Sequence, residues 1–412
     1  MNNRKFITAL LAVIIFEILM VLIRPVGLSF IKFAITLLVW ISFFLSLSVF
    51  IRNYNKLKTD VPKSSFGVFI ILLGWNIVNI MRSLFSNDGS LTTLFGNSNT
   101  SLALLVPFSL AFCYAKENLK VFNKLIISLI IIGIPAYLIF FAVSNDRFDL
   151  NYNLAFELLI IGSVFLITVI PCQISRNKFL IILGSILLLY LGIVTGYRVM
   201  LLRILLLYLM LIPIYLYIRY NRKWIPTVVL VLLFIPFFLI KSSIETQQSP
   251  FEKFLSRFER MEMSVDTRTF LYLEVYDDLK KSDKLFVGKG SNGTYYSPYF
   301  DETGEDTSNR LSVEVGILAI LLKGGLVAVF LYMAILFMAI YYALFRSKNH
   351  FVMSLGFMLV IHTLLLFISN YLDYSVYNVA IWFLIGICFS DEIRSLDISG
   401  INNILNNADQ IS

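Results

Sequence analysis

Long apolar runs separated by short polar segments extend over most of this sequence. A membrane-spanning helix needs about 20 predominantly apolar residues to cross a hydrocarbon core of about 30 Å. Runs that reach or approach this length lie at 6–23, 28–51, 65–85, 101–115, 125–143, 154–172, 179–195, 199–218, 224–241, 326–345, 350–368 and 378–390. We therefore predict an all-α polytopic membrane protein with about 12 transmembrane helices.

The composition points to the same class of protein. With 58% hydrophobic and 15% charged residues, the 412-residue chain cannot supply the polar surface of soluble globular domains. A net charge of +8 would suggest nucleic-acid binding in a soluble protein, but basic cytoplasmic loops explain it here. Cys113, Cys172 and Cys388 all lie in apolar runs, which indicates neither a disulfide framework nor a metal cluster. We expect no nucleic-acid partner, no metal and no cofactor.

The chain divides into four parts on this basis. Residues 1–241 hold nine predicted spans, residues 242–325 form one large extracytoplasmic loop, residues 326–390 hold three more spans, and 391–412 form a cytoplasmic tail. Within the large loop, apolar residues recur at helical spacing over 251–261, which predicts an amphipathic helix. Further helices are predicted over 267–281 and 311–322, the last one ending at Gly324-Gly325.

The distribution of basic residues predicts the orientation. Short loops rich in lysine and arginine stay in the cytoplasm. With the N-terminus inside, the cytoplasmic segments hold most of the basic residues outside the long loop, among them Arg52, Lys56, Lys58, Lys120, Lys124, Arg222 and Lys223. Both termini are therefore predicted to be cytoplasmic. The first span resembles a signal peptide, but Glu17 and the lack of an Ala-x-Ala-like site indicate that it is retained.

Two arginines lie where a charge is costly. Arg198 begins the predicted span 199–218 and Arg203 lies deeper in it. An arginine near the bilayer centre costs about 2.5–3.5 kcal/mol on insertion scales, so it needs a partner or a wet cavity. Arg198 could extend to the headgroups, and Arg203 could pair with Glu17 or Glu157. Alternatively, both guanidinium groups could bind phosphate oxygens, which their planar fork suits.

Several common chemistries lack the residues they need. His350 and His362 are the only two histidines and neither lies in an outward segment, which excludes an outward Ser-His-Asp triad or a histidine-ligated zinc site. Gly288-Lys289-Gly290 is too short for a Walker loop and indicates a flexible turn. The acidic residues at 301–306 could bind a divalent cation, although a solvated loop explains them better.

The order of several short motifs resembles the O-antigen polymerase and O-antigen ligase superfamily of bacterial membrane glycosyltransferases. The similar stretch covers about 195–335, roughly a third of the chain. It comprises Gly196-Tyr197-Arg198 at the start of a span, Asp266-Thr267-Arg268-Thr269-Phe270 at the start of a helix, Gly288-Lys289-Gly290, Ser308-Asn309-Arg310-Leu311, Glu314-Val315-Gly316 and Lys323-Gly324-Gly325-Leu326.

The resemblance implies roles for individual residues. In the ligases a histidine of the fourth motif is thought to be the general base, and this chain has Ser308 there, which is a poor base without activation. This difference favours the polymerase branch and leaves the base open between Glu314, the first candidate, and Asp306 or Asp373. The implied groups that bind the donor pyrophosphate are Arg198, Arg203 and Arg268. The implied loop and acceptor contacts are Tyr272, Gly288, Gly290, Ser308 and Asn309.

The reaction implied by the resemblance is polymerisation of oligosaccharide repeat units carried on undecaprenyl pyrophosphate. Glycosyl transfer would be inverting, independent of metal, and located at the outer face of the bacterial inner membrane. The product would be O-antigen, capsule or exopolysaccharide, and a flippase and a chain-length regulator would act in the same pathway. The alternatives are a polysaccharide flippase or other transporter, which Glu17, Lys32 and Glu157 keep open, and an O-antigen ligase.

Overall fold

The computed structural model describes residues 2–23, 29–85, 91–143, 163–173, 175–195, 198–220, 224–234, 269–297, 309–370 and 372–406, together with positions 159 and 236. The helices of the N-terminal half are α1 (Asn2–Ile23), α2 (Ser29–Arg52), α3 (Tyr54–Asp60), α4 (Lys63–Phe85), α5 (Leu91–Gly96), α6 (Ser101–Leu105), the 3-10 helix η2 (Val106–Tyr114), α7 (Glu117–Val143), the 3-10 helix η3 (Ile170–Cys172) and α9 (Ser175–Thr195).

The C-terminal half continues the helical bundle and adds one pair of very short strands. Its elements are α10 (Arg198–Tyr220), α11 (Trp224–Leu232), α14 (Thr269–Lys281), β1 (Tyr295–Tyr296), β2 (Asn309–Arg310), α16 (Gly316–Phe345), α17 (His350–Leu365), α18 (Val376–Phe389), α19 (Asp391–Ser395) and α20 (Ile398–Asn406). The strands pair antiparallel, with Tyr295 opposite Arg310 and Tyr296 opposite Asn309.

Within the described residues, six helices are long and apolar enough to cross a membrane, namely α2, α4, α7, α9, α10 and α16. Further apolar helices are shorter, including α17 and α18. The chain is thus an all-α, multi-pass membrane protein, whereas the number of about 12 spans stays a prediction. The predicted spans 154–172 and 224–241 are described only in part, and the predicted amphipathic helix at 251–261 lies outside the described residues.

The centre of the bundle is formed by α17 and α18. These helices have 16 and 14 residues and are buried along almost their whole length, with Trp382 and Phe383 among the largest fully buried side chains. They would extend only about 21–24 Å, less than the hydrocarbon core. They pack against α1, η2, α10 and α16, so protein surrounds them within the bundle.

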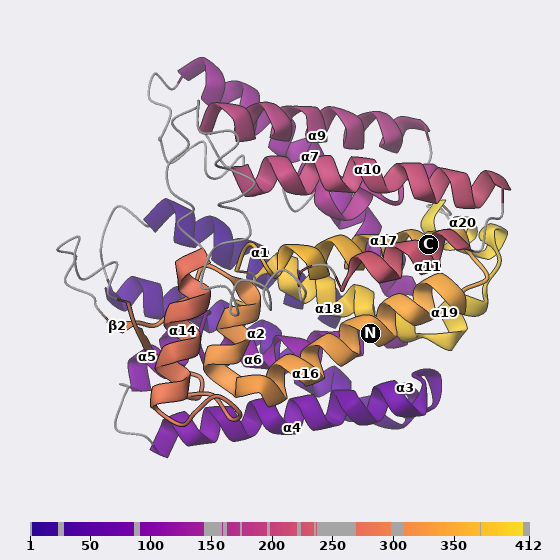
Figure 1. Cartoon of the computed structure of the whole chain (residues 1–412). Helices are drawn as coiled ribbons and strands as arrows, with labels where there is room; N and C mark the ends of the chain where they lie inside the picture. The colour runs from indigo at the N-terminus through magenta and orange to yellow at the C-terminus, as the bar shows by residue number, and fades with distance from the viewer. Residues whose placement is uncertain are drawn as a thin grey trace, which may run out of the picture.

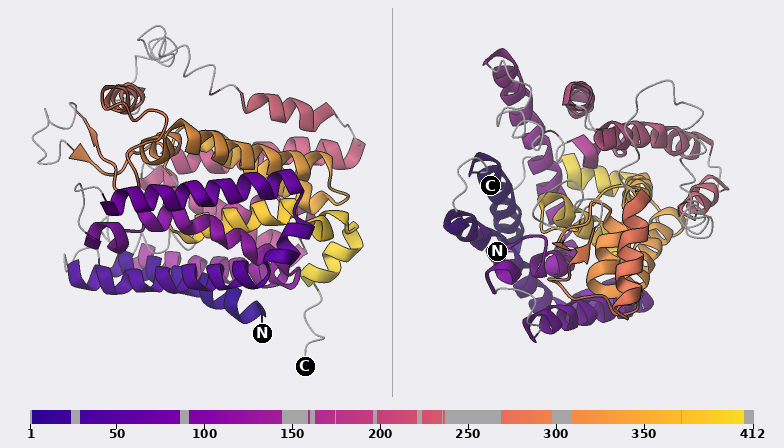
Figure 2. Two further views of the ribbon diagram at one scale, coloured as in Figure 1. Left: turned by 90° about the horizontal axis from the view of Figure 1, so that it is seen from below. Right: turned by 60° about the vertical axis from the view of Figure 1, so that its left-hand side comes forward.

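The bundle has two ends, which Figures 1 and 2 show. We call the end that carries α14 and the strand pair the loop end, and the opposite end, with α3, α19 and α20, the tail end. The tail end holds an exposed charged cluster in which Glu392 lies 3.8 Å from Lys56 and 3.4 Å from Lys116. Asp60 of α3 accepts a hydrogen bond from the Glu392 backbone at 2.9 Å, which joins α3 to α19.

The helix α14 confirms the helix predicted over 267–281, but α16 differs from the prediction. The predicted helix 311–322 and the predicted span 326–345 form one element, which starts at Gly316 and continues past Gly325. At Gly325 the backbone leaves helical geometry, with φ 68° and ψ −171°. The Gly-Gly pair thus breaks the helix without ending it.

We expect Gly325→Ala to destabilise the protein by about 1–3 kcal/mol, because that backbone geometry is accessible almost only to glycine. An added Cβ would also collide with the carbonyl of Phe286. The measurement is the thermal unfolding midpoint of the purified protein in detergent. Gly74→Ala is the matched control, since a Cβ there meets no atom within 4 Å and alanine favours the interior of α4. Equal thermal unfolding midpoints for Gly325→Ala and Gly74→Ala would contradict the claim that the backbone at position 325 requires glycine.

Candidate functional site

A buried arginine and a tyrosine face each other near the loop end of the bundle. Arg203 of α10 is 4% exposed, and its guanidinium carbon lies 4.9 Å from the ring centre of Tyr377 in the first turn of α18. A cation over an aromatic face is stabilised by about 2 kcal/mol or more when both groups are desolvated. The sequence predicts that Arg203 needs a partner or a wet cavity, and the structure gives its charge an aromatic neighbour from a distant segment.

The same tyrosine connects Arg203 to two further polar groups. The Tyr377 hydroxyl and Nδ1 of His362 on α17 share a hydrogen bond of 3.0 Å. Tyr377 and the carboxyl group of Asp373 are also electrostatic neighbours of Tyr332 on α16. We call these five residues the polar cluster, namely Arg203, Tyr332, His362, Asp373 and Tyr377. It draws on α10, α16, α17 and α18 and on the connection that precedes α18.

The polar cluster adjoins the N-terminus of α18, which is held by several side chains. Ser375 caps the helix by accepting a hydrogen bond from the Asn378 N–H at 3.2 Å. Glu17 of α1 accepts one from the Val376 N–H at 2.7 Å, so its carboxylate lies at the positive end of the helix dipole. Glu17 thereby ties the first helix to α18.

Asp373 lies in the connection just before this helix end and is half-buried. The Asn378 amide donates to its carboxylate at 2.5 Å and to its backbone carbonyl at 3.0 Å. Burial raises the pKa of Asp373 above its ordinary value of 3.8, and the hydrogen bonds from Ser375 and Asn378 offset part of that rise. A carboxylate with a raised pKa is a better proton acceptor near neutral pH than an ordinary one.

The other predicted loop residues form a separate layer over the loop end. The Tyr272 hydroxyl of α14 donates to the Phe367 carbonyl at 2.6 Å, which fixes α14 on the end of α17. Asn309 lies in β2, and Glu314 is exposed, with a carboxylate oxygen 3.9 Å from the Arg310 guanidinium. Neither Glu314 nor Asn309 belongs to the polar cluster.

Two ion-containing contacts hold α14 to the segment that follows it. Lys289 donates to the Asp278 carboxylate at 2.5 Å and to the Thr294 carbonyl at 3.0 Å. Ser297 donates to the Glu274 carboxylate at 2.7 Å. Side chains of α14 therefore hold the layer at the loop end in place through hydrogen bonds and an ion pair.

Gly288 and Gly290 form the predicted Gly-x-Gly turn, and both have positive φ, 68° and 88°. A Cβ on Gly288 would lie 2.5 Å from the backbone nitrogen of Gly325 and 2.6 Å from that of Gly324. The turn therefore packs directly against the break in α16. This close backbone approach explains why both segments contain glycine.

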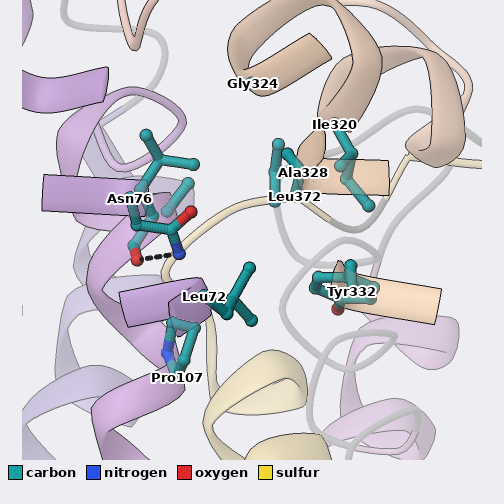
Figure 3. A pocket seen from close by; sticks show the side chains of 10 residues that line it. Leu72, Asn76, Pro107, Ile320, Gly324, Ala328, Tyr332 and Leu372 are labelled. Atoms are coloured by element: carbon teal, nitrogen blue, oxygen red, sulfur yellow. Dashed lines mark hydrogen bonds between the residues drawn. The ribbon is translucent and has the colours of Figure 1, made fainter. Parts of the chain in front are cut away.

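A small cavity lies next to the cluster, beneath the break in α16 (Figure 3). Its volume is about 20 Å³, which suits about one water molecule and no sugar. Asn76 of α4 borders it and donates to the Leu104 carbonyl at 2.8 Å, while Tyr332 borders the other side. Leu372, the neighbour of Asp373, also lines the cavity.

The structure thus brings together only part of the predicted site. Arg203 and Asp373, far apart in the sequence, both belong to the polar cluster. Arg198 is the first residue of α10, and nothing further is described of its side chain. Arg268, Asp306 and Ser308 lie outside the described residues. The joint binding of pyrophosphate by three arginines therefore stays a prediction.

Three residues of this region were not predicted as site residues from the sequence. Tyr332 and Tyr377 lie inside apolar runs, where tyrosine gives no signal of its own. Lys323 is 3% exposed, and its ammonium group contacts the Asn99 carbonyl. A lysine within an apolar helical stretch, directly before Gly-Gly, was the signal that could have identified it.

No protein-family model matches this chain, and no curated protein matches it either.

We expect Asp373→Asn to change the pH dependence of stability. A carboxyl group whose folded-state pKa is raised contributes stability below its unfolded pKa and loses it as the pH rises. The unfolding midpoint of Asp373→Asn relative to the unsubstituted protein should therefore increase between about pH 4 and about pH 7.

Asp397→Asn is the control for this experiment, because hydrogen bonds from Ser399 and the Gly400 N–H lower the pKa of Asp397. Its midpoint difference should move in the opposite direction over the same range, and only slightly, since this carboxylate is solvent-exposed. A difference for Asp373→Asn that stays constant with pH would contradict the raised pKa.

Proposed function

We propose that the protein polymerises oligosaccharide repeat units carried on undecaprenyl pyrophosphate, by inverting glycosyl transfer. The observation that carries the proposal is that two charged residues adjoin the first turn of α18, Arg203 over the ring of Tyr377 and Asp373 through its hydrogen bonds from Asn378. One residue supplies a permanent cation and the other a carboxylate, which are the two groups that a metal-independent transfer from a pyrophosphate donor needs. The motif order of the sequence supports the same reaction class.

In this proposal Arg203 acts on the leaving group. Cleavage of a sugar–pyrophosphate bond leaves additional negative charge on the diphosphate, which a nearby guanidinium stabilises. Tyr377 holds the guanidinium from one side, so its position is set before the donor arrives. Arg198 and Arg268 would complete the diphosphate site from the loop end.

Asp373 is the proposed general base that removes the proton of the acceptor hydroxyl. We prefer it to Glu314, the first candidate from the sequence, for two reasons. Glu314 is exposed and lies near the Arg310 guanidinium, outside the polar cluster. Asp373 belongs to the cluster and has a raised pKa, which suits a base that works near neutral pH.

The proposed location is the bacterial inner membrane, with the loop end facing outward and both termini in the cytoplasm. Lys56 and Lys116 at the tail end fit the excess of basic residues expected on the cytoplasmic side. Donor and acceptor lipids would then reach the polar cluster from the outer leaflet. A flippase and a chain-length regulator are the expected partners.

A lipid-oligosaccharide transporter is the second candidate, and one observation favours it. α16 is broken at Gly325, two residues after the buried Lys323, and discontinuous helices with nearby charges are typical of transporters. A ligase would use the same donor but a different acceptor. The three functions differ in which glycan accumulates, and on which side of the membrane.

We expect Arg203→Ala and Arg268→Ala, expressed at normal level, each to abolish long-chain polysaccharide while single repeat units still reach the cell surface. Arg219→Ala is the matched control. Arg219 lies near the other end of α10, where it contacts the exposed Tyr215 and Tyr220, so its loss should leave the chain length unchanged.

The glycan ladder of cells carrying each variant is the measurement. An unchanged ladder in Arg203→Ala would remove this residue from the proposed mechanism. Repeat units trapped in the cytoplasmic leaflet would support the transporter instead, and full-length polymer that fails to reach its final acceptor would support a ligase.

A further inference from the structure

The segment between α14 and β1 fills the break in α16. On the side before the break, the Lys289 N–H donates to the Leu322 carbonyl at 2.8 Å and the Gly290 N–H to the Lys323 carbonyl at 2.9 Å. On the side after it, the Leu326 N–H donates to the Leu285 carbonyl at 3.0 Å. Backbone groups on both sides of the break are thus paired with the segment 285–290.

The carbonyls of Phe286, Val287 and Gly288 are also paired. Phe286 accepts from the Val327 N–H at 3.3 Å. Arg82 of α4 donates to the Val287 carbonyl at 2.6 Å and to the Gly288 carbonyl at 2.7 Å. A turn at the surface of a protein can leave such groups to water. Pairing of these carbonyls lowers the cost of placing the turn against a bilayer, where an unpaired group in hydrocarbon costs several kcal/mol.

Two helices allow the depth of the segment to be estimated. From Leu326 to Phe345, just before Arg346, α16 runs for about 20 residues without a charge, or about 30 Å. From Phe66 to Phe85, following Lys63, α4 runs for the same length with Arg82 as its one charge. Both lengths equal a hydrocarbon core, so Leu326 and Phe85 mark its boundary at the loop end.

The segment contacts both helices at or inside this boundary. Leu285 and Phe286 bond the first residues of the apolar part of α16, and Val287 and Gly288 bond Arg82, which lies three residues before Phe85. The Phe286 side chain is 68% exposed, next to an exposed face of α16 where Phe330 is 73% exposed. An apolar side chain with this exposure, at this depth, faces lipid.

We infer that residues 285–288 form an interfacial turn that inserts into the leaflet at the loop end, with Phe286 among the acyl chains. The turn contacts the bilayer rather than another protein, because the exposed apolar face beside it continues along α16 into the membrane-spanning part. The sequence predicts that these residues belong to the extracytoplasmic loop 242–325. The inference does not depend on the proposed glycosyl transfer.

Spin-label depth measurement tests the inference. Single cysteines would replace Phe286, Phe330 and Ser282 in a chain whose Cys113, Cys172 and Cys388 are changed to alanine, and the nitroxide-labelled proteins would be placed in phosphatidylethanolamine–phosphatidylglycerol vesicles. The label at 286 should resemble the label at 330, with more collisions with oxygen than with a water-soluble nickel chelate. The label at Ser282, which is exposed four residues earlier, should show the reverse.

A label at 286 that behaves like the one at 282 would overturn the inference, because the turn would then lie in water. A label at 286 that neither reagent reaches would also overturn it, because a protein surface, including a second copy of this chain, would then cover the turn.

A second measurement avoids the cysteine replacements. Brominated lipids should quench the added fluorescence of Phe286→Trp and leave that of Ser282→Trp unchanged. Equal quenching of the two variants would count against the inserted turn.

Discussion

The structure depends on one constraint, which is that a bilayer solvates neither backbone polar groups nor charges. Every irregularity in a spanning helix must therefore be paired within the protein. The break at Gly325 of α16 meets this requirement through the segment 285–290, whose backbone bonds both sides of the break. Arg82 completes the arrangement, since its charge near the end of α4 is satisfied by carbonyls of the same segment.

The buried charges near the loop end follow the same rule in different ways. Arg203 is placed over the ring of Tyr377, Lys323 contacts the Asn99 carbonyl, and Glu17 accepts from the N-terminus of α18. Each contact joins segments that are distant in the sequence. The groups that the membrane makes costly thus also hold the loop end together, and they lie around the helix end where the proposed reaction would occur.

The layer at the loop end is attached firmly to the bundle. Tyr272, Asp278 and Glu274 fasten α14 to the bundle and to the segment after it, so the layer is fixed in place. Figure 1 shows α14 lying across the ends of the bundle helices near α16. In the proposed polymerase this layer would receive the acceptor glycan, while the polar cluster beneath it would bind the donor.

Much of the fold was predictable, because apolar run length and helical spacing are local properties. The runs at 28–51 and 65–85 and the stretch 267–281 are helices close to the predicted bounds. Fewer residues of the candidate site could be predicted from the sequence. Arg203 could be selected because charge is rare in a span, whereas its neighbour Tyr377 carries no signal in an apolar run. Gly324-Gly325 was correctly identified as a helix-breaking signal, but the continuation of α16 beyond it was not.

The sequence by itself determined that the chain enters a membrane as helices and which of its charges would be costly there, since both follow from the free energy of transferring local segments out of water. Only the tertiary structure decided how those charges are neutralised and where the helix break is filled. Those pairings join residues more than a hundred positions apart, such as Arg203 with Tyr377 and Arg82 with Val287. Packing across the bundle determines which residues pair, and a local sequence pattern contains no information about that packing.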